Sequence, residues 1–144
     1  GEIVARGHNP EKAAWRIGVN KPVDDSLSMN QELQTILQLT DVGMATSGNY
    51  RNFYYKEGKK YAHTINPKTG YPVQHNLLST TVVAKDCMTA DALATAFMVM
   101  GLEKAEAFAN AHPEIEAYFI YSDEKGNFQN YFTKGMKKYI AEKQ

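Results

Sequence analysis

A β-branched segment followed closely by an apolar helical segment is the feature that most constrains the fold. Residues 77–84 are rich in Val and Thr, which favour strands. Residues 86–100 are almost free of charge, with Asp86 or Thr89 as the expected N-cap and Gly101 as a natural stop. The sequence therefore predicts a strand that leads directly into a helix.

The rest of the chain predicts an α+β fold, with a mostly antiparallel sheet and helices packed on one face. Leu93, Phe97 and Met100 recur at helical spacing and predict the stripe of the first helix that faces the core. Further helices are expected over residues 102–111 and 133–142, and a polar connector over 21–29. The predicted strands are residues 3–5, 15–19, 33–40, 43–46, 52–55, 60–64, 77–84, 115–121 and 128–132.

Composition excludes several functional classes. The 144 residues carry 16 basic and 16 acidic side chains, so the net charge does not favour a nucleic-acid partner. The single cysteine, Cys87, excludes an internal disulfide and a zinc site built on paired cysteines. The longest apolar run, within residues 92–100, is too short to cross a membrane.

Asp91 and Thr95 are the first candidate ligands. Their spacing of four residues places both side chains on one face of the predicted helix. Carboxylate and hydroxyl oxygens suit Mg²⁺ or Ca²⁺ rather than zinc. A purely structural interpretation is also open, and spacing alone favours it. Asp91 would then stabilise the helix dipole, and Thr95 would bond back to its own helix.

Residues 51–68 combine five basic side chains and one acidic side chain with several aromatic rings. Cations beside aromatic faces suit an anionic ligand with a flat ring, such as a nucleotide. The alternative is a hairpin whose lysines keep a sheet edge soluble, and this is favoured for the lysines. Arg51, directly after a Ser-Gly-Asn-Tyr turn, is the better ligand candidate.

His63 lies at a strand end before a loop rich in Pro and Gly, a position suited to a general base or to phosphate contact. A structural histidine is the alternative, and without other information it is favoured. Cys87 lies near a helix N-terminus, which favours the thiolate, and a Cys–His nucleophile with His63 is one interpretation. An inert, small apolar residue is the simpler interpretation.

Three motifs occur in a characteristic order. Residues 45–51 are Ala-Thr-Ser-Gly-Asn-Tyr-Arg, 63–73 are His-Thr-Ile-Asn-Pro-Lys-Thr-Gly-Tyr-Pro-Val, and 88–96 are Met-Thr-Ala-Asp-Ala-Leu-Ala-Thr-Ala. Together with Gly101, they resemble the C-terminal half of the ApbE family, the FAD:protein FMN transferases. The resemblance covers essentially the whole chain and implies a T-fold-like α+β architecture. It implies that residues 1–144 form a single unit, the C-terminal half of an ApbE-like flavin transferase. The N-terminal half of that protein is missing from this sequence.

The resemblance also implies site residues. The helix motif of the family supplies two metal ligands, which fall on Asp91 and Thr95. The loop motif lies against the flavin nucleotide and so places His63, Thr64 and Ile65 there, with His63 as the candidate base. Ser47 and Arg51 match an element that borders the same cleft.

By the same resemblance, FAD is the substrate, Mg²⁺ or another divalent cation is the cofactor, and FMN passes to a threonine hydroxyl with release of AMP. The acceptor is a flavoprotein subunit of a membrane redox complex. Family proteins are mostly exported and lipid-anchored, which implies the periplasmic side of the bacterial inner membrane. FAD hydrolysis to FMN and AMP, a non-catalytic FAD-binding module and a purely structural fragment are the alternatives.

Two departures from the family pattern are Asn66 in place of a common Asp and Thr64 in place of an aliphatic residue. Neither touches the metal pair. The family segment that supplies a further metal ligand is absent, so we expect this chain alone to bind metal poorly.

Overall fold

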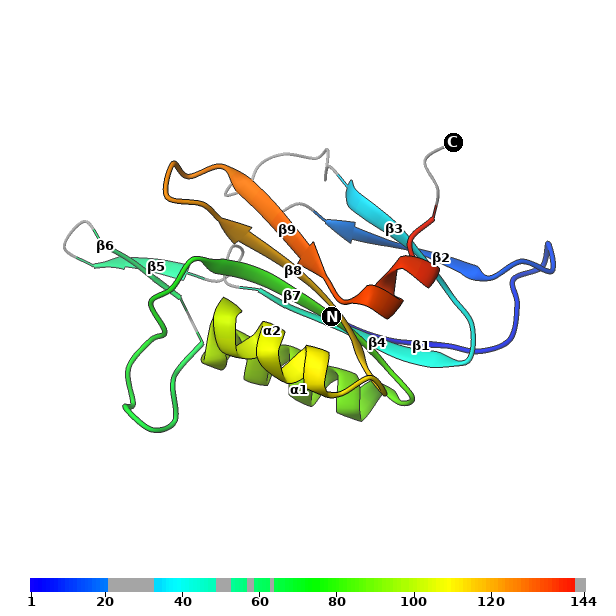
Figure 1. Ribbon diagram of the computed structural model, residues 1–144, viewed down its shortest axis with the longest axis horizontal. Coiled ribbons are helices and arrows are strands. Elements are labelled where there is room, and N and C mark those ends of the chain that lie inside the picture. The colour runs from blue at the N-terminus through cyan, green and yellow to red at the C-terminus, as the bar shows by residue number, and fades with distance from the viewer. Residues whose placement is uncertain (21–32, 49–52, 57–58, 63, 142–144) are drawn as a thin grey trace.

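The computed structural model describes residues 1–20, 33–48, 53–56, 59–62 and 64–141 (Figure 1). The helices are α1 (Cys87–Met100) and α2 (Leu102–Ala111), with a short 3-10 helix, η1 (Lys134–Lys138). The strands are β1 (Glu2–Ala5), β2 (Trp15–Asn20), β3 (Leu33–Leu39), β4 (Val42–Gly48), β5 (Phe53–Lys56), β6 (Lys59–Ala62), β7 (Leu77–Ala84), β8 (Glu116–Ser122) and β9 (Phe128–Phe132). None of the described helices is long and apolar enough to span a membrane.

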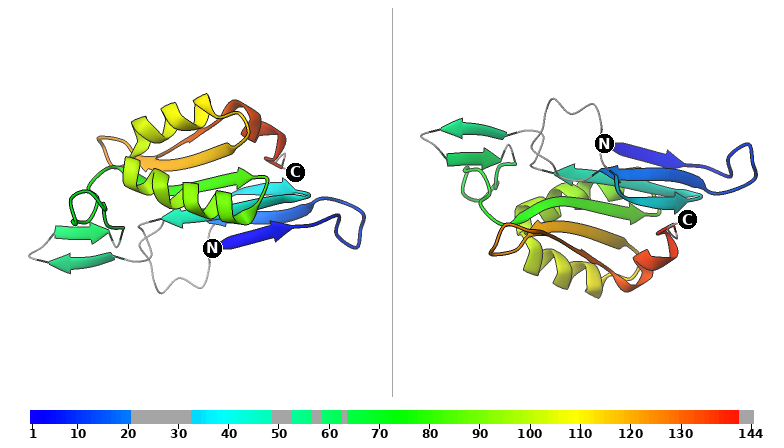
Figure 2. Two further views of the ribbon diagram at one scale, coloured as in Figure 1. Left: turned by 90° about the horizontal axis from the view of Figure 1, so that it is seen from below. Right: turned by 90° about the horizontal axis from the view of Figure 1, so that it is seen from above.

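The main sheet has five strands in the order β1-β4-β7-β8-β9, and every neighbouring pair is antiparallel. Two further pairs, β2–β3 and β5–β6, form separate two-stranded sheets. The β5–β6 hairpin extends outward from one end of the main sheet (Figure 2). The predicted α+β class with antiparallel strands is therefore confirmed.

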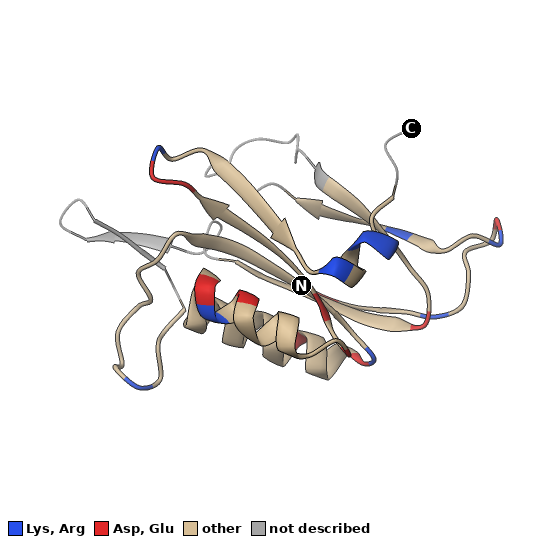
Figure 3. Cartoon of the chain, viewed as in Figure 1, with Lys and Arg blue, Asp and Glu red and all other residues tan. Residues whose placement is uncertain are grey.

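Side chains alternate along each strand, so the two faces of the main sheet pack against different layers. Both α-helices lie on one face, as predicted, and β2, β3 and η1 cover the other (Figure 2). The helix-side core comprises Ala45, Leu77, Val82, Ala84, Ala90, Ala94, Phe97, Met98, Ala105, Ala109, Ile115, Ala117 and Phe119. The opposite core comprises Ala5, Val19, Leu37, Leu39, Met44, Val83, Tyr118, Ile120 and Met136. Among the described residues no charged side chain is buried, and the charges lie in turns, on the helices and near strand ends (Figure 3).

Helix α1 corrects the predicted core stripe. Phe97 is fully buried, but Met100 is 37% exposed and Leu93 is only partly buried. The buried residues of the helix are Ala90, Ala94, Phe97 and Met98. The inward face therefore combines two alanines with Phe97 and Met98, and the small alanine side chains let the helix approach the sheet closely. The hydroxyl of Thr80 in β7 reaches the Ala94 carbonyl at 2.7 Å, which shows how close that approach is.

The C-terminal segment also differs from prediction. The expected helix over residues 133–142 is replaced by η1, which ends at Lys138. Ile140 then forms a bridge with Leu37 of β3, and the Gln38 N–H donates to the Tyr139 carbonyl at 2.6 Å. Pairing with the edge of β3 satisfies backbone groups that a longer helix would otherwise have paired internally.

Candidate functional site

The candidate site lies where the end of β4 meets α1. Strand alternation turns Gly43, Ala45 and Ser47 toward the helix. A Cβ at Gly43 would overlap the backbone of Asp86 and Cys87 at the start of α1. Glycine is therefore what allows the helix N-terminus to rest directly on the strand.

The start of α1 is fixed by Asp86. Its carboxylate accepts hydrogen bonds from the N–H of Thr89 at 2.8 Å and from the Thr89 hydroxyl at 3.0 Å. The backbone N–H bond, followed by the hydroxyl bond, lowers the pKa of Asp86 below its usual value. Of the two predicted caps, Asp86 is the one the structure uses.

Ser47 and Thr95 join the strand to the helix. Their hydroxyl oxygens lie 3.1 Å apart, within hydrogen-bond distance. Strand β4 extends two residues past its predicted end, because Ser47 and Gly48 pair with Thr80 and Ser79 of β7. Ser47 is thus held by a strand rather than by a turn. The Thr95 hydroxyl bonds to Ser47, not to its own helix as the structural alternative required.

Asp91 lies one helical turn before Thr95, on the same face of α1. It is past the first turn of the helix, where Asp86 already provides the cap. Asp91 is partly buried, and no hydrogen bond reaches its carboxylate from the described part of the chain. A partly buried carboxylate one helical turn from a hydroxyl, with no hydrogen-bond partner among the described residues, is an arrangement that suits a hard cation.

The loop after β6 is closed by its own hydrogen bonds. The N–H of Val73 donates to the Thr64 carbonyl at 3.0 Å, and Ile65 forms a bridge with Pro72. The Asn66 side-chain oxygen accepts from the Lys68 N–H at 2.9 Å, an acceptor role that an aspartate would also fill. The substitution of Asn66 for the common Asp therefore preserves the turn. Ile65 is 48% exposed, so its side chain is open to a ligand.

Not all predicted site residues are described. Ser47 of β4 and Thr95 of α1 are brought together, and Asp91 lies on the same helix face as Thr95, whereas Thr64 and Ile65 lie on the loop. Arg51 and His63 fall outside the described residues. Cys87, whose thiol lies 3.9 Å from the Met44 carbonyl, is the first residue of α1.

Comparison with known proteins decides the family, because residues 1–119 match the ApbE family. The chain belongs to the ApbE family. It is 40% identical over 141 residues to the FAD:protein FMN transferase of Vibrio cholerae, a match that covers 98% of this chain and 40% of that protein. The Escherichia coli K12 transferase is 35% identical, with 98% and 38% covered.

Solved structures agree with this ApbE assignment. The flavin transferase ApbE from Vibrio cholerae superposes with a TM-score of 0.78 and 37% identity, covering 96% of this chain and 42% of that one. The ApbE protein from Thermotoga maritima also gives a TM-score of 0.78, at 28% identity, with 99% and 43% covered. The chain thus spans about two fifths of the length of the ApbE relatives it matches.

The oxygen atoms of the candidate site are of the type that Mg²⁺ prefers, but they are too few to complete its coordination shell. The two predicted metal ligands, Asp91 and Thr95, offer oxygen only, which favours Mg²⁺ over zinc. The described residues contain no group of three or more His, Cys, Asp or Glu side chains suited to a metal ion. Mg²⁺ commonly completes its coordination with water and substrate phosphates, so two protein ligands here are compatible with it.

Proposed function

We propose that this chain is the C-terminal part of a transferase that moves FMN from FAD to a threonine hydroxyl of a flavoprotein subunit, releasing AMP. The observation that carries the proposal is the Asp91 carboxylate, which has no hydrogen-bond partner among the described residues and lies one turn from a Thr95 hydroxyl bonded to Ser47. This arrangement occurs in an ApbE-family chain whose curated relatives are named FAD:protein FMN transferases.

Asp91 and Thr95 are the residues that would hold the divalent metal, for which we propose Mg²⁺. When bound, the metal supplies Lewis-acid neutralisation of the pyrophosphate charge. Ser47 fixes the rotamer of Thr95 through the hydroxyl contact. The remaining protein ligands would come from the part of the transferase outside this chain.

The proposed reaction is a phosphoryl transfer. The threonine oxygen of the acceptor attacks the FMN phosphorus, the phosphorus–oxygen bond to AMP breaks, and AMP leaves with the bonding electrons. The hydroxyl proton passes to a base, for which His63 is the candidate. Thr64 and Ile65 would contact the flavin nucleotide, and Arg51 would border the same cleft beside Ser47.

FAD hydrolysis to FMN and AMP is the second candidate, because water in place of threonine would use the same oxygen cluster. We further propose that the acceptor belongs to a membrane redox complex and that the intact protein is lipid-anchored on the periplasmic side of the inner membrane. These two points rest on family resemblance.

The test supplies the longer protein that carries this sequence with FAD, Mg²⁺ and a subunit bearing the acceptor threonine. Covalent flavin fluorescence on the acceptor, with AMP in the supernatant, is the expected result. Free FMN and AMP without labelled acceptor would instead establish hydrolysis. FAD that stays bound and intact would show a binding module and would overturn both enzymatic proposals.

A further inference from the structure

His75 connects the end of the nucleotide loop to the end of α1. Its two ring nitrogens make hydrogen bonds with two different elements. The N–H of Leu77, the first residue of β7, donates to Nδ1 at 3.2 Å. Nε2 lies 2.6 Å from the Met98 carbonyl in the last turn of α1. Because a carbonyl can only accept, Nε2 carries the proton and Nδ1 is the acceptor, so both contacts require the neutral ring with its proton on Nε2.

The Met98 carbonyl is one of the groups that a helix leaves without an internal donor at its C-terminus. α1 has no basic residue in its last turn. The N–H of Gly101 donates to the Phe97 carbonyl at 3.0 Å, which leaves Met98 to be satisfied by another group. His75, which is distant in sequence, supplies that donor.

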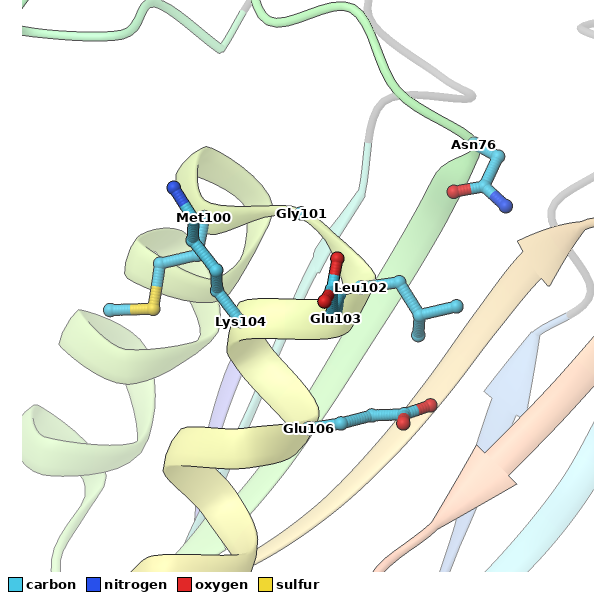
Figure 4. Close-up of a pocket in the computed structure, with 7 residues that line it drawn as sticks. All are labelled: Asn76, Met100, Gly101, Leu102, Glu103, Lys104 and Glu106. Atoms are coloured by element: carbon cyan, nitrogen blue, oxygen red, sulfur yellow. The ribbon is translucent and has the colours of Figure 1, made fainter.

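The contact is also sterically close. Gly101 has a φ of +78°, and a Cβ there would lie 3.3 Å from Cδ2 of His75. The turn at Gly101 therefore leaves room for the imidazole ring beside the α1–α2 junction. Figure 4 shows this junction, with Asn76, the residue after His75, across from Gly101.

In the sequence, His75 directly follows the loop after β6, which is closed by its own hydrogen bonds. Val73, two residues earlier, is buried and donates its N–H to the Thr64 carbonyl at 3.0 Å. On the helix side, Met98 follows Thr95 by one turn. His75 is therefore linked in one direction to the proposed nucleotide contacts and in the other to a proposed metal ligand.

We propose that His75 is a positioning residue that holds the loop containing Thr64 and Ile65 in a fixed relation to the helix bearing Asp91 and Thr95. It touches neither substrate nor metal in this proposal. The bond from Nε2 to the Met98 carbonyl is the critical one, because it reaches the helix that carries the metal ligands. This inference rests on the proposed function.

Three substitutions separate the two bonds. His75→Gln can place an amide N–H near the position of Nε2 and keep the bond to Met98. His75→Asn can place its oxygen near the position of Nδ1 and keep only the bond to Leu77. His75→Ala removes both. His112→Ala is the matched control, because it removes another histidine hydrogen bond, the 2.9 Å contact with Glu114, in the segment between α2 and β8.

The measurements, made on the longer protein, are Mn²⁺ affinity by electron paramagnetic resonance, the KM for FAD, and amide hydrogen exchange in the last turn of α1. We expect His75→Ala and His75→Asn to weaken Mn²⁺ binding about tenfold, comparable to the loss of one partly buried hydrogen bond. Exchange at Gly101 should accelerate in the same two variants. His75→Gln should stay within about threefold of wild type, and His112→Ala should not change Mn²⁺ binding.

Unchanged Mn²⁺ affinity and KM in all three His75 variants, with only a lower melting temperature, would show a purely structural role and overturn the inference. Equal impairment of His75→Gln and His75→Ala would overturn the assignment of the critical bond to Met98. A wild-type protein that neither binds Mn²⁺ nor turns over FAD would refute the proposed function itself, a result that is distinct from both.

Discussion

The hydroxyl oxygens of Ser47 and Thr95 lie 3.1 Å apart and join the end of β4 to the middle of α1. A double-mutant cycle with Ser47→Ala and Thr95→Val should therefore give a coupling energy of about 0.5–1.5 kcal/mol in the free energy of unfolding. Urea denaturation of the wild type, both single variants and the double variant measures it. Strictly additive effects would show that the contact contributes nothing to stability.

Asp91 should matter for activity and not for folding. Because its carboxylate has no partner within the described chain, Asp91→Asn should change the free energy of unfolding by less than about 0.5 kcal/mol. Turnover of FAD should fall by about 100-fold or more, since the charge that would hold the metal is lost. Assays at several Mg²⁺ concentrations provide the measurement.

Glu103 offers a matched control for Asp91. It is an exposed acidic residue on the neighbouring helix α2, so Glu103→Gln removes the same charge outside the candidate site. We expect this variant to keep wild-type turnover. Full activity of Asp91→Asn beside it would refute the metal assignment.

Gly43 should be intolerant of any side chain. A Cβ at this position would overlap the Asp86 and Cys87 backbone, so Gly43→Ala must push the start of α1 away from β4. A loss of about 1–3 kcal/mol in the free energy of unfolding is expected, as for other overpacked sites. Gly1→Ala, with nothing within 4 Å of the added atom, is the control and should be neutral. Equal stability of the two variants would contradict the close approach.

We expect the free energy of unfolding to depend on pH through Asp86. Hydrogen bonds from Thr89 lower its pKa in the folded protein, so the unfolded chain takes up the proton first as the pH falls. The stabilising contribution is complete above the unfolded value near 3.8 and is lost as the pH falls through the lower folded value. Asp86→Asn keeps a capping side chain that does not titrate. The stability advantage of wild type over this variant should shrink from about pH 6 to about pH 3, and a constant difference would contradict the assignment.

Asn66 should be replaceable by aspartate but not by alanine. Its side-chain oxygen accepts the Lys68 N–H, and only Asp retains such an acceptor. Under the proposed function, Asn66→Asp should keep the KM for FAD within about threefold, and Asn66→Ala should raise it as the turn loosens. Steady-state kinetics of both variants checks this. A wild-type KM in Asn66→Ala would show that the turn does not depend on this bond.

Local sequence signals found most of the elements. The β-branched run of β7, the cap at Asp86 and the stop at Gly101 predicted the strand–helix unit almost to its ends. These local signals gave wrong predictions for segments whose conformation depends on pairing with a strand distant in the sequence. The segment after Lys138 pairs with β3 instead of continuing as a helix, and Ser47 is drawn into β4 by Thr80 on the neighbouring strand.

Only some residues of the candidate site can be predicted from the sequence. Helical spacing is enough to predict that Asp91 and Thr95 share one face, and motif order is enough to indicate the ApbE family. His75 carried no such signal, because no spacing connects it with Met98, 23 residues away. The bond from Leu77 is local, but the bond to the Met98 carbonyl exists only because β7 and α1 lie against each other.

By itself, the sequence determined the local conformations, the oxygen-only chemistry of the candidate ligands and the family, because these depend on residue type and short-range spacing. Tertiary structure alone decided that α1 turns its alanines inward, that Thr95 bonds to Ser47, and that His75 reaches the end of α1. Each of these results depends on how closely the helix can approach the sheet. At the start of α1 this close approach requires Gly43, because a side chain there would overlap the backbone of Asp86 and Cys87. Residues 43 and 86 are far apart in the sequence, so local sequence patterns do not predict the contact.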